Sequence, residues 1–242
     1  MNQEILAPLL GSDHPTVKKV IKLANEILAE GRLLNIEYLY RRAKRELQIP
    51  REGLLTIIQY MVNKKIIIDG SKFTKDTILN NSFRNLIYNF IRDNIGLHFS
   101  VIKRNLMKNL KENQIGTGQL IWHLEMLLKF RLIKSFMVGN HTIFIPVEFD
   151  ENIAKIYYHA RNMIRNKILR HLIIEKQCTR PVLHEAIKES RENVYYHIKI
   201  LIENDYIIDN NRELSLNSKL SKYIIEAIQY LSHKKELNNK II

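Results

Sequence analysis

A pattern that occurs twice in this chain constrains its fold more than any other feature. When the sequence is shifted by 74 positions, Trp122 falls on Tyr196 and His123 falls on His197, with matching aliphatic residues around them. The aliphatic positions recur three and four residues apart, which is the spacing of one face of an α-helix. Two such helices in one chain indicate serial copies of a small module.

The residues before these helices support the same repeat. Phe83-Arg84-Asn85 resembles Ile164-Arg165-Asn166 at a shift of 81 positions, and a weaker third copy would place Leu54 and Ile58 in the aliphatic positions. We therefore expect three modules, which occupy residues 1–80, 81–150 and 151–242.

The predicted elements follow one order in all three modules. The first should contain helices at 16–30, 36–47 and 51–64, followed by a β-hairpin at 66–79 that turns at Asp69-Gly70. The middle one should contain helices at 83–93, 101–110 and 117–130, a short strand at 97–99 and a hairpin at 132–146. The third should contain a helix at 152–174, broken near His159, and then helices at 181–188 and 191–204 and a hairpin at 206–216. The predicted fold class is mainly α with small β-hairpins (α+β), as tandem winged-helix modules.

A last predicted helix at 220–231 has no counterpart in the other modules. Its apolar residues recur on one side, so this side should pack either on the same chain or on a second copy. A homodimer formed through this C-terminal helix is one of the two expected outcomes.

Charge and composition narrow the class of partner. The chain has 242 residues, of which 45% are hydrophobic, enough for packed cores. Its 38 Lys and Arg residues against 25 Asp and Glu residues give a net charge of +13, and basic residues are in excess in each module. Such an excess favours polyanions, either nucleic acid or an acidic membrane surface.

Several classes of protein lack support in the sequence. Cys178 is the single cysteine, so an internal disulfide or a multi-cysteine zinc site is excluded and a reducing, intracellular setting is expected. There is no signal-peptide pattern and no apolar run long enough to span a membrane, so we expect a soluble cytoplasmic protein. No phosphate-binding loop or catalytic motif is present, and we expect no enzymatic activity, cofactor or metal.

The middle module resembles a known family. Its segments IGLHFSVIKRNL and GTGQLIWHLEMLLKFRLIKS, followed by a glycine-turned hairpin that ends in FIP, are similar to archaeal winged helix-turn-helix transcription regulators of the broad ArsR/MarR-like class. The third module resembles them through VYYHIKILIENDYI. The first departs further, with Ile57 where the other two modules have His. The resemblance covers residues 81–216 and extends more weakly over 15–80.

The resemblance implies binding of double-stranded DNA, by a transcription regulator or a chromatin-associated factor that would associate with the nucleoid. In this family the third helix of a module enters the major groove by its N-terminal part, and the hairpin wing touches the DNA backbone. The DNA-facing residues would then be Thr117, Gln119 and His123 in the middle module, Arg191, Asn193, Tyr195 and His197 in the third, and Arg51 and Thr56 in the first. The expected phosphate contacts are Lys103, Arg104, Lys108 and Lys134. His123 and His197 could equally be partly buried, and Trp122 and Tyr196 are expected to pack rather than to bind.

The alternative function is a protein-interaction scaffold. Tandem winged helices also occur in subunits of the endosomal-sorting complex of type II and of RNA polymerase machinery, so the fold does not decide between these uses. A DNA reader needs basic residues beside the start of the third helix, whereas a scaffold would have apolar patches there. Lys103, Arg104 and Lys108 favour DNA, but the wing sequence MVGNHT carries no basic residue.

Overall fold

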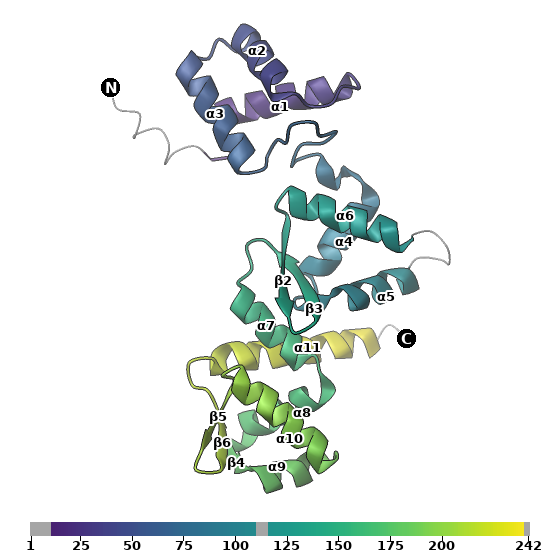
Figure 1. Ribbon diagram of the computed structural model, residues 1–242, viewed down its shortest axis with the longest axis vertical. Coiled ribbons are helices and arrows are strands. Elements are labelled where there is room, and N and C mark those ends of the chain that lie inside the picture. Colours follow the sequence, from purple (N-terminus) through teal and green to yellow (C-terminus); the bar gives the residue numbers. More distant parts are fainter. Residues whose placement is uncertain (1–10, 110–115, 240–242) are drawn as a thin grey trace. The chain divides into compact units, whose positions relative to one another are not determined.

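The computed structural model describes residues 11–109 and 116–239, and at 107–109 and 235–239 it describes the backbone alone. The chain forms two compact units, Met1–Asp93 with Ser100–Ser135 and Asn94–Phe99 with Phe136–Ile242. Helices make up most of the ribbon, and two small three-stranded sheets complete it (Figure 1). The predicted fold class, mainly α with small β-hairpins, is confirmed.

The first unit begins with three helices around one core. These are α1 (Pro15–Ala29), α2 (Ile36–Glu46) and α3 (Arg51–Asn63), close to their predicted bounds. The starts of α1 and α2 are stabilised locally: Pro15 occupies the first turn of α1, and the Asn35 side chain accepts a hydrogen bond from the backbone N–H of Tyr38 at 2.8 Å. The fully buried side chains of this core include Val17, Val20, Leu34, Leu39, Leu54 and Met61.

The β-hairpin predicted at 66–79 does not form, so this prediction is wrong. The Asp69-Gly70 turn forms, with the Ser71 N–H bonded to the Ile68 carbonyl at 3.2 Å, but the segments on either side are not strands. The backbone of Leu34 takes the place of a partner strand, since Gly70 N–H donates to its carbonyl at 2.7 Å and its own N–H donates to Ser71 at 2.9 Å. The backbone groups are thus satisfied by a distant loop, which a local pattern does not reveal.

The rest of the first unit consists of a short 3-10 helix (Ile78–Asn80), α4 (Ser82–Arg92), most of α5 (Phe99–Asn109) and α6 (Thr117–Lys129). Helix α4 packs against α6 and against the 3-10 helix. The end of α6 is tied to the first three helices, because the Arg131 guanidinium donates to the Asn63 carbonyl at 3.2 Å and Lys75 donates to the Arg131 carbonyl at 3.4 Å.

Two sheets have the same strand order. Strands β1 (Leu97–His98), β2 (Ile133–Val138) and β3 (His141–Pro146) form a sheet ordered β1-β3-β2, and β4 (Gln177–Thr179), β5 (Ile207–Asn210) and β6 (Glu213–Leu216) form one ordered β4-β6-β5. The predicted hairpins at 132–146 and 206–216 are therefore confirmed. Strand β4 was not predicted.

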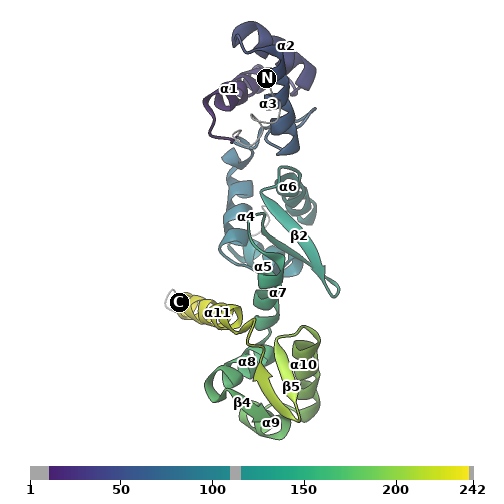
Figure 2. The same cartoon turned by 90° about the vertical axis from the view of Figure 1, so that its left-hand side faces the viewer.

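The second unit contains α7 (Glu151–Ala160), α8 (Met163–Glu175), α9 (Arg180–Ile187), α10 (Arg191–Glu203) and α11 (Ser221–Asn239). The predicted break near His159 is confirmed, because Asn162 caps α8 by accepting hydrogen bonds from the N–H groups of Ile164 and Arg165, both at 3.1 Å. Figure 2 shows the second sheet beside α8, α9 and α10, which contribute most of the core around it.

The C-terminal helix α11 packs on its own chain. It lies against α7 and α8, and its apolar residues Ile224, Ala227, Ile228 and Leu231 are buried in the core of the second unit (Figure 1). The apolar side that suggested a homodimer through this helix is therefore covered within one chain.

Candidate nucleic-acid interface

Helix α6 buries one face and exposes the start of the other. Leu120, Leu124 and Leu127 are at most 3% exposed, as the predicted stripe requires, while Gln119 is exposed and Thr117 is half-buried. The Gln119 side-chain oxygen accepts a hydrogen bond from the Gly116 N–H at 3.2 Å. Gln119 thus satisfies one of the free donors at the helix start, and its side chain is otherwise exposed.

His123 is turned towards α4 rather than outward. Its ring makes an edge contact with Phe83, with 4.9 Å between the centroids, and its Nδ1 atom is buried without a hydrogen-bond partner among the described residues. Burial, and then the charge of Arg84, lower the pKa of His123 below its ordinary value. The neutral form of His123 is therefore favoured, and its ring packs between α6 and α4.

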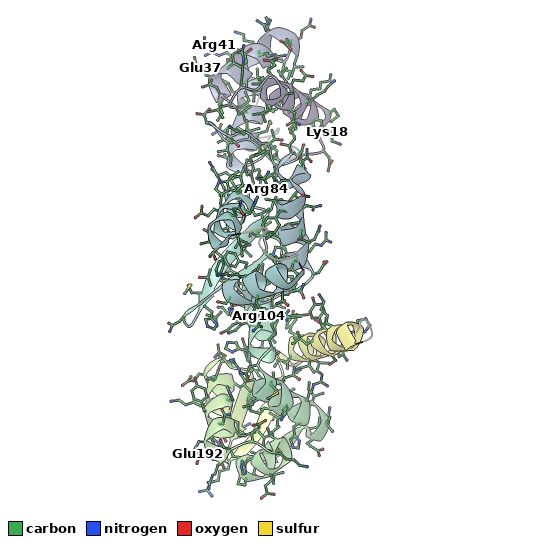
Figure 3. The ribbon with its side chains drawn as sticks, turned by 90° about the vertical axis from the view of Figure 1, so that its right-hand side faces the viewer. Lys18, Glu37, Arg41, Arg84, Arg104 and Glu192 are labelled. Atoms are coloured by element: carbon green, nitrogen blue, oxygen red, sulfur yellow. The ribbon has the colours of Figure 1, made fainter. Side chains whose placement is uncertain are left out.

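Sequence reasoning missed Arg84, which organises this part of the unit. Its side chain is 2% exposed, and its Nε donates to the Ile78 carbonyl at 2.8 Å. The guanidinium lies over two rings, 4.4 Å from the Phe73 centroid and 5.5 Å from the Trp122 centroid. Figure 3 labels Arg84 where side chains of α4 and α6 meet. The available signal was the match of Phe83-Arg84-Asn85 with the third module.

Trp122 is more exposed than expected for a packing residue. It is 47% exposed, and its neighbour Ile121 on the same helix is 42% exposed. Tyr196, at the equivalent position of α10, is 60% exposed. Each of these two rings is thus partly packed on the protein and partly exposed to solvent.

The predicted phosphate contacts lie on α5 and β2. Arg104 is exposed on α5 and Lys103 is half-buried beside it (Figure 3). Lys134 is half-buried on β2. Lys108 lies near the end of α5, where its side chain is outside the described residues.

Helix α10 repeats this arrangement in the second unit. Arg191 and Asn193 are exposed in its first turn, and the Ser190 hydroxyl caps it by accepting from the Asn193 N–H at 3.4 Å. Tyr195 is half-buried, with the guanidinium carbons of Arg191 and Arg180 at 5.2 and 6.0 Å from its ring centroid. Arg180 is a further basic residue of this surface.

His197 does not share the exposure of its neighbours. Only 8% of it is exposed, and its Nδ1 atom is buried without a partner among the described residues. Burial, and then the charge of Arg165, lower its pKa. The burial of His197 argues against its expected place among the DNA-facing residues and agrees with the alternative that this side chain is buried.

Arg165 is the counterpart of Arg84 and joins a second buried cluster. Its guanidinium hydrogen-bonds to His159 Nδ1 and lies 5.9 Å from the Tyr158 ring centroid. Burial, and then the charge of Arg165, lower the pKa of His159 to about 4. Burial raises the pKa of Tyr206, whose ring lies 5.4 Å from that of His159. Each unit therefore places an arginine near an aromatic-His pair, and this arginine is buried in the first unit and half-buried in the second.

A shallow groove of about 610 Å³ runs along α10. Most of its charges are paired, since Arg180 bonds to Asp209 at 2.6 Å and Lys199 lies 3.7 Å from Glu203. Glu192 stands at the groove's end in the first turn of α10, where the middle module has Gly118, and Figure 3 marks it at the outer side of that helix.

The hairpin of the first sheet is anchored near its turn by His141, the first residue of β3. The rings of His98 and His141 stack at 4.3 Å, and His141 Nδ1 forms a 2.9 Å hydrogen bond with the Tyr158 hydroxyl of α7. These contacts hold the hairpin to α7.

In the first three helices, the expected contacts Arg51 and Thr56 are both exposed on α3. The Thr56 hydroxyl donates to the Glu52 carbonyl at 2.9 Å, so it is engaged within the helix. Arg51 lies at the first position of α3.

Other chemistry has little support in the described part of the chain. No group of three or more His, Cys, Asp or Glu side chains there could hold a metal ion. Burial, and then Glu175, raise the pKa of the half-buried Cys178, which disfavours a reactive thiolate. Among the described helices, none is long and apolar enough to cross a membrane.

Comparison with known proteins gives one informative similarity. No family model matches the chain. It is 28% identical over 180 residues to an uncharacterized HTH-type transcriptional regulator of Methanocaldococcus jannaschii. The matched segment covers 74% of this chain and 43% of that relative, so the chain spans less than half of the relative's length.

Proposed function

We propose that this protein is a DNA-binding transcription regulator built from two winged-helix modules, at residues 81–150 and 151–242, and a winged-helix-like module without a hairpin wing at residues 1–80. The observation that carries the proposal is the repeated third helix, α6 and α10, which buries an aliphatic stripe and leaves its first turn exposed. The name of the Methanocaldococcus relative, an HTH-type transcriptional regulator, supports the same assignment.

The proposed mechanism follows from the size of a helix and of the major groove. One α-helix fits the groove, and side chains of its first turns face the base edges. In the middle module, Thr117 and Gln119 would contact bases or phosphates, and Arg104, Lys103, Lys108 and Lys134 would bind phosphates. In the third module the contacts would come from Arg191, Asn193 and Tyr195. Arg51 and Thr56 remain proposed contacts of the first module.

The charge of the chain supports a polyanionic partner. The net charge of +13 attracts phosphate over a distance of about a Debye length, roughly 10 Å at 0.1 M salt. Each phosphate that a Lys or Arg neutralises releases counterions, so the affinity should fall steeply with salt.

The test is a fluorescence-anisotropy titration of the full chain against labelled random and genomic duplexes at about 50 and 200 mM salt, a range over which several phosphate contacts are lost. We expect tight binding at low salt that weakens by orders of magnitude at high salt. Arg104→Ala should weaken binding equally on all sequences and reduce the salt dependence by about one phosphate contact. No binding at low salt would refute the proposal.

A protein-interaction scaffold is the second candidate function. It is favoured by the exposed apolar side chains on the third helices, Ile121, Trp122 and Tyr196, and by the carboxylate of Glu192 in the first turn of α10. Salt-independent association with a protein partner, without any affinity for duplex DNA, would decide for it.

A further inference from the structure

One face of α6 carries open apolar side chains, with the exposed Glu125 between them. Gly118, Ile121 and Trp122 lie three and four residues apart and therefore share this face. Ile121 and Trp122 are 42% and 47% exposed, and a Cβ atom added at Gly118 would meet no atom within 4 Å. Nothing in the described part of the first unit thus covers the beginning of this face at Gly118.

The Trp122 ring is held in place by contacts with Arg84 and His123. The buried Arg84 guanidinium lies 5.5 Å from its centroid and is itself fixed by its hydrogen bond to the Ile78 carbonyl. The His123 ring makes an edge contact with it at 4.8 Å. A ring that is already ordered loses little conformational entropy when it binds, so Trp122 offers a preformed contact surface.

The apolar side chains of this face of α6 are candidates for contacts with DNA bases, beside the polar Gln119. The Gln119 oxygen accepts a hydrogen bond from the Gly116 N–H, so a contact with adenine through this oxygen would compete with the bond at the helix start. Apolar side chains in the major groove contact the C5-methyl group of thymine, which cytosine and purines lack.

We propose that Ile121 and Trp122 contact thymine methyl groups, so that α6 prefers thymine at the base pairs that face its second turn. This inference rests on the proposed DNA-binding function. Two exposed apolar side chains are a small area compared with the roughly 800 Å² that each partner buries in a typical protein interface. Basic residues also flank this face at the helix end, where Lys129 and Arg131 are exposed.

The third module provides an internal contrast. Glu192 occupies the position of Gly118, and Tyr195 and Tyr196 take the positions of Ile121 and Trp122. Glu192 places a charged side chain at the start of this face on α10, whereas Gly118 leaves the start open on α6. The exposed Glu125 of α6 lies further along the same face, where α10 has Lys199. The thymine preference therefore belongs to α6 and not to α10.

The test compares an A·T-rich duplex with the same duplex synthesised with deoxyuridine in place of thymidine, which removes only the methyl groups. The full chain should bind the uracil duplex about fourfold more weakly for each contacted methyl group. Trp122 is the single tryptophan, so its intrinsic fluorescence should change when the thymine duplex binds.

Variants assign the effect to α6. Trp122→Ala should bind the two duplexes more equally, whereas Tyr196→Ala, the matched change on α10, should discriminate as the wild type does. If Trp122→Ala fails to fold, Trp122→Phe and the wild-type comparison still test the inference. Equal wild-type affinity for both duplexes, or discrimination that persists in Trp122→Ala, overturns the thymine contact while salt-sensitive binding keeps the proposed function. The absence of any DNA binding overturns both and favours the scaffold.

Discussion

At the residue scale, the unusual feature of this chain is a buried or half-buried arginine beside a histidine in each unit. Arg84 is 2% exposed, although a buried charge costs free energy unless it is paired or hydrogen-bonded. A backbone carbonyl and two aromatic rings compensate it. Arg165 has the same place in the second unit and uses His159 as its acceptor. This acceptor role requires a neutral imidazole, which makes the cluster sensitive to acid.

The stability of the second unit should therefore fall in acid. The pKa of His159 is lowered to about 4 by burial, by Arg165 and, more weakly, by Lys155, whereas an unfolded histidine titrates near 6.5. The folded state excludes a proton that the unfolded state binds, so the contribution is complete above about pH 6.5 and is lost as the pH falls towards 4. Between pH 7 and 5 the loss should be about 2 kcal/mol.

Urea unfolding of the wild type and of His159→Gln at both pH values checks this. Glutamine keeps an acceptor for Arg165 but does not titrate, so the variant should lose about 2 kcal/mol less than the wild type over this interval. Equal losses in the two proteins would contradict the prediction.

At the element scale, a glycine fixes the approach of β1 to α7. Gly96 has φ +78°, and a Cβ atom there would lie 2.6 Å from the Tyr158 nitrogen and 3.1 Å from the Ala154 carbonyl oxygen. Arg161 holds the same approach by donating to the Ile95 carbonyl from Nε at 3.1 Å and Nη2 at 2.8 Å. Because these neighbours of Gly96 are backbone atoms, they cannot move aside for an added Cβ atom as the end of a flexible side chain would.

Gly96→Ala should cost about 3 kcal/mol, from left-handed strain together with overpacking. Gly31→Ala is the matched control, because Gly31 has φ +79° but no atom within 4 Å of an added Cβ, and it should cost only about 1–2 kcal/mol. Thermal unfolding followed by circular dichroism should show the larger decrease in Tm for Gly96→Ala. A similar decrease for both variants would mean that the close approach is not rigid.

The helices and strands differ in how well the sequence predicts them. Helices with local signals were predicted within a residue or two, as at Pro15 and Asn35, because caps and periodicity act within one turn. The hairpin at 66–79 was wrong because the backbone of Leu34, a distant residue, bonds to the turn. Strand β4 was missed because its three residues carry no periodic pattern and depend on pairing with β6.

The candidate site also contains some residues whose environment the sequence predicted and others whose environment it did not. The exposure of Gln119, Arg191 and Asn193 followed from helical spacing, which places residues of the first turn opposite the aliphatic stripe. The burial of Arg84 did not follow, because arginine is normally exposed and its partners Phe73 and Ile78 lie in an irregular segment. Its recurrence as Arg165 was the available signal.

At the scale of the whole molecule, the two third helices carry different charges on equivalent faces. Helix α6 begins with Gly116, Thr117 and Gly118 and has no acidic residue in its first turn, whereas α10 has Glu192 there. An exposed carboxylate beside DNA repels phosphate by an amount that salt screens. The net charge of +13 draws the whole chain to DNA, so this local repulsion would weaken the α10 contact without abolishing binding.

Removal of that charge should strengthen DNA binding. Glu192→Gln keeps the size of the side chain, and we expect about threefold tighter binding at low salt, a gain of roughly 0.7 kcal/mol that is typical of one exposed charge. The gain should shrink as the salt concentration rises, because screening already suppresses the repulsion. Glu226→Gln, on the exposed side of α11, is the control, since it changes the net charge equally at another surface. Anisotropy titrations with one duplex at two salt concentrations measure both variants. If both tighten binding equally, the effect comes from net charge alone, and α10 does not approach the phosphates in the complex.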